Sequence, residues 1–158
     1  MTTRPSRCLI LACGNLLRED DGIGPWLAEW AANRFKADPR VTVISRPQWT
    51  PEQAQDIAIA DYVMFIDSSV TAPAGQVTLT VVIPAASFVA HATHHLDASH
   101  LLALAHQLYN QSPRSSSLLT VGAGSLELRE GFSDLARAAL PKACKFLEST
   151  VLNHLNSY

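Results

Sequence analysis

Three acidic side chains stand next to one another near the start of the chain. Glu19, Asp20 and Asp21 follow the apolar run "CLILACGN" and belong to the stretch "REDDGIG" at 18–24. Adjacent carboxylates repel one another, and a tight turn does not need them. The run is therefore either a solvated bend whose charges favour a helix N-terminus, or part of a site that holds a positive charge.

Two further stretches offer metal ligands. Asp67 ends the apolar run "YVMFID" at 62–67, and His94 and His95 lie in "HATHHLDASH" at 91–100. Two carboxylates and one imidazole from three loops would form a mixed oxygen and nitrogen site, which suits a divalent transition metal with open positions. Each residue also has a structural interpretation, because "DSS" is a good turn former and a single histidine often has no ligand role.

The elements that must position these residues alternate between strand and helix. We predict strands at 7–13, 41–45, 62–67, 76–82 and 117–125, with 76–82 towards an edge, and helices at 23–36, from Thr50-Pro51 onward, at 97–109 and at 132–152. The serine-rich stretch at 112–117 is interpreted as a polar loop, and His100, His106 and His154 as surface residues of helices.

This alternation predicts a single α/β domain over residues 1–158. We expect three layers, with a mostly parallel, twisted sheet of about five strands between helices on both faces. In open sheets of this kind, ligands bind beyond the carboxyl ends of the strands. That rule selects the segments 14–22, 67–71 and 122–125.

Composition narrows the functional classes. The chain has 158 residues, of which 47% are hydrophobic and 16% are charged, so we expect a compact globular protein. Its net charge of −2 argues against nucleic-acid binding. It has neither a cleavable signal pattern nor an apolar run of about 18 residues, so no membrane insertion is expected. The scattered Cys8, Cys13 and Cys144 indicate reduced thiols in the cytoplasm.

Two other functions, dinucleotide binding and a receiver domain, fit the first loop less well. Gly14-Asn15-Leu16-Leu17 is not the dinucleotide motif G-x-G-x-x-G, and the acidic residues after it would repel a pyrophosphate. A metal-binding receiver domain of signalling proteins also has acidic residues after its first strand and an aspartate ending its third. It needs a lysine after the last strand, where this chain has "GAGS" at 122–125.

Four motifs in series make the chain resemble the endopeptidases that mature nickel–iron hydrogenases. They are "LILACGNLLREDDGIG", "VMFIDSS", "HHLDASHLLALA" and "LLTVGAGSLEL", and they cover nearly the whole chain. The resemblance implies one cut that removes a C-terminal extension from the hydrogenase large-subunit precursor after nickel insertion. It implies nickel ligands at Asp21, Asp67 and His94, with His95 as the alternative, and a protein that is monomeric when free.

The chain departs from the family pattern in two loops. Leu16 stands where proline is common, and Glu19 where a small residue is common. The stretch "SRPQWTPE" at 45–52 resembles a branch of the family in which Gln48 and Glu52 border the cleft. Trp49 is either an anchor for the precursor or a side chain that packs inward under the next helix start.

The metal has two possible uses in such a site. It polarises the scissile carbonyl and activates a water, which would make Asp21 and Asp67 catalytic residues. Alternatively, nickel already held by the precursor docks into these ligands, so that metallation is recognised before cutting. We see no Ser/His/Asp order and no Asp-Thr-Gly motif, and Cys8 and Cys13 lie inside a strand. We favour docking as recognition, together with metal-assisted attack by water.

Overall fold

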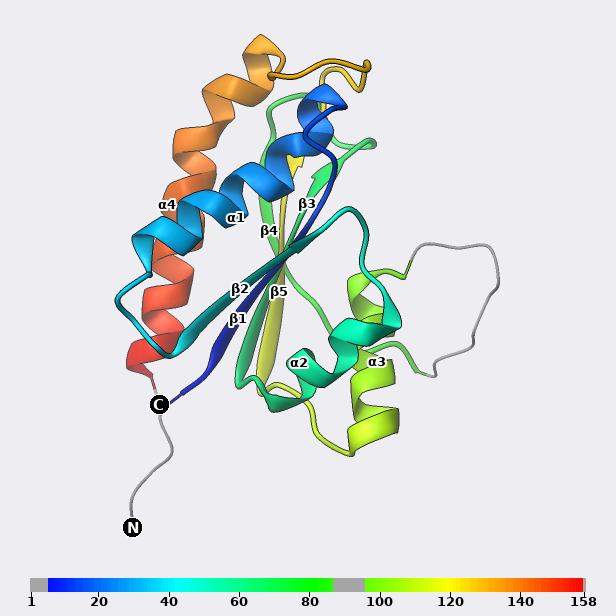
Figure 1. Ribbon diagram of the computed structural model, residues 1–158, viewed down its shortest axis with the longest axis vertical. Helices are drawn as coiled ribbons and strands as arrows, with labels where there is room; N and C mark the ends of the chain where they lie inside the picture. Colours follow the sequence, from blue (N-terminus) through cyan, green and yellow to red (C-terminus); the bar gives the residue numbers. More distant parts are fainter. Residues whose placement is uncertain (1–5, 87–95, 158) are drawn as a thin grey trace.

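The computed structural model describes residues 6–86 and 96–157 and shows a sheet between two layers of helices (Figure 1). The strands are β1 (Cys8–Cys13), β2 (Val41–Arg46), β3 (Tyr62–Ser69), β4 (Val77–Val81) and β5 (Ser115–Gly122). The helices are α1 (Ile23–Arg34), α2 (Ala54–Ile59), α3 (Ala98–Tyr109) and α4 (Asp134–Asn156), with 3-10 turns η1 (Glu19–Gly22) and η2 (Pro51–Gln53). The predicted α/β fold class is confirmed.

The strand order β2-β1-β3-β5-β4 places the two candidate carboxylates side by side. β1, β2, β3 and β5 are parallel, and β4 lies antiparallel at an edge, as the sequence predicts. From β1 the chain builds outward to β2 on one side, and then crosses back to place β3 on the other side. The order therefore reverses between β1 and β3, where a crevice for ligands forms in such sheets.

The central strands are buried on both faces, which explains their continuous apolar runs. Alternate side chains of β1 and β3 pack against α1 and α4 on one face: Cys8, Ile10, Ala12, Tyr62, Met64 and Ile66. The intervening side chains pack against α2 and α3 on the other face: Leu9, Leu11, Cys13, Val63 and Phe65. Figure 1 shows the same division of the helices between the two faces of the sheet.

Two surface predictions are wrong. Ser116 and Ser117 are buried and belong to β5, because parallel pairing with β3 satisfies the backbone of a stretch that looks polar in sequence. His154 is half-buried, and its ring stacks on Tyr62 at 3.7 Å between centroids. Its burial lowers the pKa of His154. Both differences arise because contacts with β3 decide the burial of these residues.

Trp49 packs inward, so its interpretation as an exposed anchor is wrong. Its side chain is 8% exposed and meets the ring of Phe65 edge to face, with 5.3 Å between centroids. Thr50 and Gln53 form a reciprocal capping box at the start of η2, which places Trp49 one residue before the cap. A hydrophobic residue at this position often packs against the first turn, and Trp49 shares a cluster with Ala54.

All three cysteines are free and buried, which agrees with the predicted lack of a disulfide framework.

Across residues 6–86 and 96–157, the helices are too short or too polar to cross a membrane.

Candidate functional site

Asp21 and Asp67 meet at the carboxyl-end edge of the sheet, where β1 and β3 are neighbours. Asp21 lies in η1, directly beyond β1, and Asp67 lies near the carboxyl end of β3. The Ser68 hydroxyl donates to Asp21 Oδ1 at 3.3 Å, and the Ser68 backbone N–H donates to Asp67 Oδ1 at 2.8 Å. One serine thus contacts both carboxylates, and the two residues that the sequence selects share one place in the fold.

Cys13 is a third member of this group that sequence reasoning missed as a site residue. Its thiol lies close enough to the Asp67 side chain for that carboxylate to act on the pKa of Cys13. Burial raises the pKa of Cys13, and the negative charges of Asp67 and Asp21 raise it further. The thiol therefore stays protonated and can serve as a donor. Its place at the very end of β1 is the one sequence signal for this role.

Close backbone packing turns the chain from β1 back onto the site. Gly14 has a φ of +143°, and a Cβ there would lie 2.0 Å from the carbonyl oxygen of Asp21. The N–H of Asn15 donates to the Asp21 carbonyl at 3.2 Å and to its Oδ2 at 2.9 Å. Glycine is therefore required at position 14, and Asp21 is held against the end of β1.

The other two acidic residues bond to the segment 124–133 and are not the solvated bend that the sequence allows. Glu19 is 2% exposed and forms an ion pair with Arg129. Asp20 is fully buried and accepts hydrogen bonds from Ser133 and from the N–H groups of Gly124 and Ser125. Burial pushes the pKa of Asp20 upward, but these bonds outweigh it and hold the pKa below its usual range.

The candidate histidines His94 and His95 lie outside the described residues. The helix α3 follows them, and Asp97, the residue just before it, caps it by accepting the N–H of His100 at 2.9 Å. α3 packs on the same face of the sheet as Cys13, and Figure 1 shows it next to α2 beside the lower half of the sheet.

The described residues provide some, but not all, of the ligands that a divalent cation needs. Asp21 and Asp67 provide carboxylate oxygens, which bind many divalent ions. Within 6–86 and 96–157, histidine, cysteine, aspartate and glutamate form no group of three that would hold a metal. A complete site thus requires a ligand from elsewhere, such as the segment with the two histidines or the substrate.

The loop after β2 begins beside the site. The Gly14 N–H donates to the carbonyl of Arg46 at 3.1 Å, so the chain leaves β2 next to the turn that carries Asp21. Gln48 and Glu52, which the resemblance places at the border of the cleft, are both exposed.

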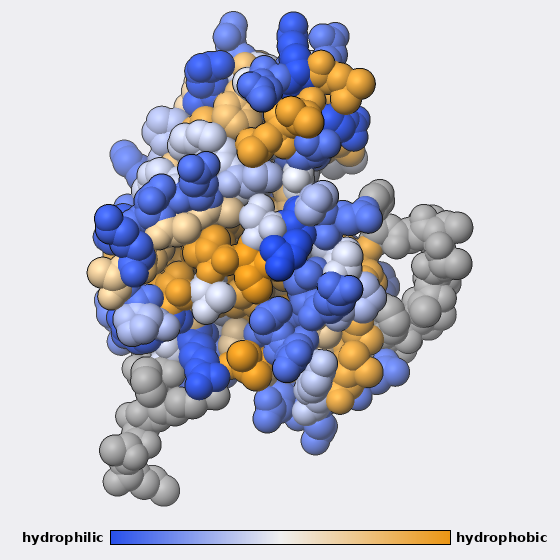
Figure 2. Space-filling model, viewed as in Figure 1, coloured by the Kyte–Doolittle hydropathy of each residue, from blue (hydrophilic) through white to orange (hydrophobic). Residues whose placement is uncertain are grey.

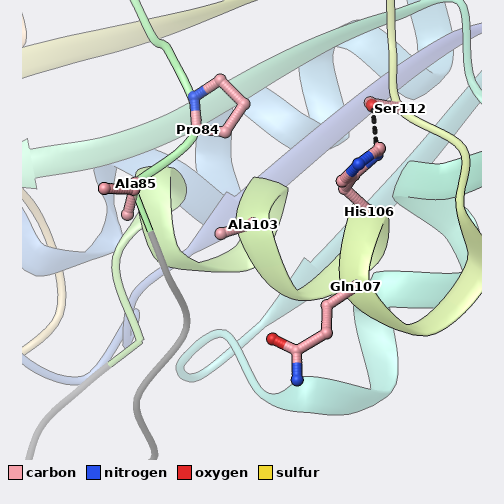
Figure 3. A pocket seen from close by; sticks show the side chains of 7 residues that line it. Pro84, Ala85, Ala103, His106, Gln107 and Ser112 are labelled. Atoms are coloured by element: carbon pink, nitrogen blue, oxygen red, sulfur yellow. Dashed lines mark hydrogen bonds between the residues drawn. The ribbon is translucent and has the colours of Figure 1, made fainter.

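A separate pocket of about 450 Å³ lies between α3 and the chain after β4 (Figure 3). Pro84, Ala85, Ala103, Gln107, His106 and Ser112 line it, and the last two share a hydrogen bond of 3.3 Å. Among the described residues, those that line this pocket include no carboxylate. Neither Asp21 nor Asp67 borders this pocket, which is distinct from the candidate site.

Comparison with known proteins gives matches in structure alone. No family model matches the sequence, and no curated protein matches it. The hydrogenase maturating endopeptidase HybD from E. coli superposes with a TM-score of 0.69 at 20% identity, over 93% of each chain. The [NiFe] hydrogenase maturation protease HycI from Thermococcus kodakarensis superposes with a TM-score of 0.64 at 21% identity, over 96% of this chain and 94% of the other.

A hydrogenase 2 maturation peptidase from a Thaumarchaeota archaeon gives a TM-score of 0.65 at 20% identity, over 92% of this chain and 98% of the other. The chain shares the fold of these three proteins. This is the fold that the sequence resemblance implies.

The receiver alternative gains no support from the structure. β5 ends at Gly122, and Ala123, Gly124 and Ser125 follow, so no lysine stands at the strand end. The sheet order also differs from the 2-1-3-4-5 order of receiver folds, because β4 is antiparallel and lies outside β5.

Proposed function

We propose that this protein is an endopeptidase that removes the C-terminal extension of a nickel–iron hydrogenase large-subunit precursor after nickel insertion. The observation that carries the proposal is the meeting of Asp21 and Asp67 through Ser68, where the strand order reverses. The fold shared with maturation endopeptidases and the four sequence motifs support the same activity.

In this proposal, the nickel arrives with the precursor and is recognised by Asp21, Asp67 and His94, with His95 as the alternative histidine. A bound nickel ion would supply Lewis-acid polarisation of the scissile carbonyl. The protein's own contribution is orientation: Asn15 and Ser68 hold the Asp21 carboxylate, while Ser68 and Cys13 hold that of Asp67. A carboxylate accepts about four hydrogen bonds, so the two bonds to Asp21 orient it and leave room for a cation.

Exposed apolar side chains near the site favour a protein over a small molecule as the substrate. Leu16 and Leu17 are 50% and 58% exposed in the loop before Asp21. The exposed Leu128 belongs to a neighbouring segment, because the Glu19 N–H donates to the carbonyl of Arg129. Figure 2 shows apolar residues gathered at the upper end of the molecule. Exposed apolar surface of this kind commonly marks protein contacts.

The test is to incubate the purified protein with candidate large-subunit precursors, nickel-loaded and nickel-free, and to follow the loss of the extension by gel shift. We expect processing of a nickel-loaded precursor alone. Equal processing of both forms would overturn recognition through nickel. A failure to process any nickel-loaded precursor would overturn the endopeptidase function itself.

A second experiment identifies the histidine ligand. We expect His94→Ala to lose processing of the nickel-loaded precursor, and His95→Ala to retain most of it. His106→Ala is the matched control, because His106 is exposed on α3 and lines the separate pocket. The opposite result would make His95 the ligand, and full activity of both variants would remove histidine from the site.

A further inference from the structure

Asp20 stands out as a buried, charged residue beside the site, without a role in the mechanism above. Its side chain is fully buried, although an aspartate almost never is unless it is paired. Its partners come from the segment between β5 and α4, more than 100 residues along the chain. The carboxylate therefore joins two parts of the chain that have no local connection.

Both oxygens of Asp20 are used. Oδ2 accepts the N–H of Gly124 at 2.6 Å, the N–H of Ser125 at 3.1 Å and the hydroxyl of Ser133 at 2.6 Å. Oδ1 accepts the N–H of Ser133 at 2.8 Å. Ser133 is also the N-cap of α4, so the bonds reach the start of the longest helix. Charge-assisted bonds of this kind are stronger than neutral ones.

The turn that carries Asp21 is held on two sides: Asn15 and Ser68 bond to Asp21 itself, and Glu19 and Asp20 bond to the segment 124–133. Arg18, the N-cap residue of η1, makes no side-chain capping bond. Besides the Asp20 carboxylate, the backbone N–H of Glu19 and that of Asp20 donate to Arg129 and Ser125. The whole turn is thus fastened to the segment 124–133.

We propose that Asp20 is a positioning residue that fixes the Asp21 carboxylate for cation binding by tying η1 to the start of α4. The inference rests on the proposed function, because it assumes that Asp21 and Asp67 receive a divalent cation. Space around the bonds is limited: a Cβ on Gly124 would lie 2.8 Å from Ser133 Oγ. The segment 124–133 is therefore closely packed around these bonds, and their loss should shift the turn that carries Asp21.

The test uses Asp20→Asn, which keeps the shape but replaces one accepting oxygen with an amide that faces a donor. Loss of such an outer partner typically lowers metal affinity by about 10- to 100-fold, and we expect this loss for Ni²⁺ measured by calorimetry. The absorption spectrum of bound Co²⁺ should change as well, because it reports ligand geometry. In the metal-free protein, amide hydrogen exchange should increase at residues 18–22 while β1 and α1 stay protected.

Leu155→Ala is the matched control for general destabilisation, because Leu155 is buried near the far end of α4. It should lower the melting temperature without changing the cation affinity or the exchange at 18–22. Unchanged affinity and unchanged local exchange in Asp20→Asn, with a wild type that binds Ni²⁺ or processes the precursor, would overturn this inference alone. A wild type that neither binds Ni²⁺ nor processes any precursor would overturn the proposed function and the inference with it.

Discussion

Asp21→Ala and Asp67→Ala are each expected to abolish processing of a nickel-loaded precursor while the protein stays folded. The two carboxylates lie at the carboxyl-end edge of the sheet beside β1 and β3 and are only half-buried, so their loss removes little core packing. Removing a ligand should cost more than the 10- to 100-fold that is typical of an outer-shell change, so we expect a loss above about 100-fold. Processing is measured by gel shift and folding by thermal melting. The free energy of unfolding of each variant should stay within about 1 kcal/mol of the wild-type value.

Asp56→Ala is the matched control, because it removes a half-buried aspartate from the first turn of α2, an element that carries neither Asp21 nor Asp67. It should process the precursor as fast as wild type does. Asp67→Asn separates charge from shape, since the amide keeps the volume but loses one accepting oxygen. Cleavage by both alanine variants at the wild-type rate would contradict the role of the two carboxylates.

Trp49→Ala should cause a large loss of stability with no change in substrate recognition. Trp49 is 8% exposed and packs on Phe65 in the cluster below α2 and α3. Truncating a buried tryptophan costs about 3–5 kcal/mol, which lowers the melting temperature of a domain of this size by on the order of 10 °C. Calorimetric melting measures this change, and precursor affinity well below the melting temperature should equal that of wild type.

Trp49→Phe is the informative companion variant. The indole Nε1 is buried and, within the described residues, has no hydrogen-bond partner. Phenylalanine keeps an aromatic contact with Phe65 and removes that unsatisfied donor, so its loss of stability should be clearly smaller than that of alanine. An unchanged melting temperature in Trp49→Ala, with weaker binding of the precursor, would contradict inward packing and restore the anchor interpretation.

Much of the fold follows from local patterns in the sequence. The continuous apolar runs of β1 and β3 predict strands buried on both faces, because helices cover both sides of a parallel sheet. Thr50-Pro51 predicts a helix start, and the structure has a capping box there. The positions of Asp21 and Asp67 at strand ends are also readable, because the carboxyl ends of parallel strands share one edge.

The tertiary structure alone decides what each acidic residue does. Nothing in the sequence distinguishes Glu19, Asp20 and Asp21 from one another. In the structure, Glu19 forms an ion pair with Arg129, Asp20 accepts hydrogen bonds from the segment 124–133, and Asp21 accepts one from Ser68.

The same holds for Cys13, Trp49 and His154, whose surroundings come from β3. Periodicity along the chain determines which elements form and which face they bury, because that information is local. The partner of a single polar or aromatic side chain depends on segments up to about a hundred residues away, which only packing brings into contact.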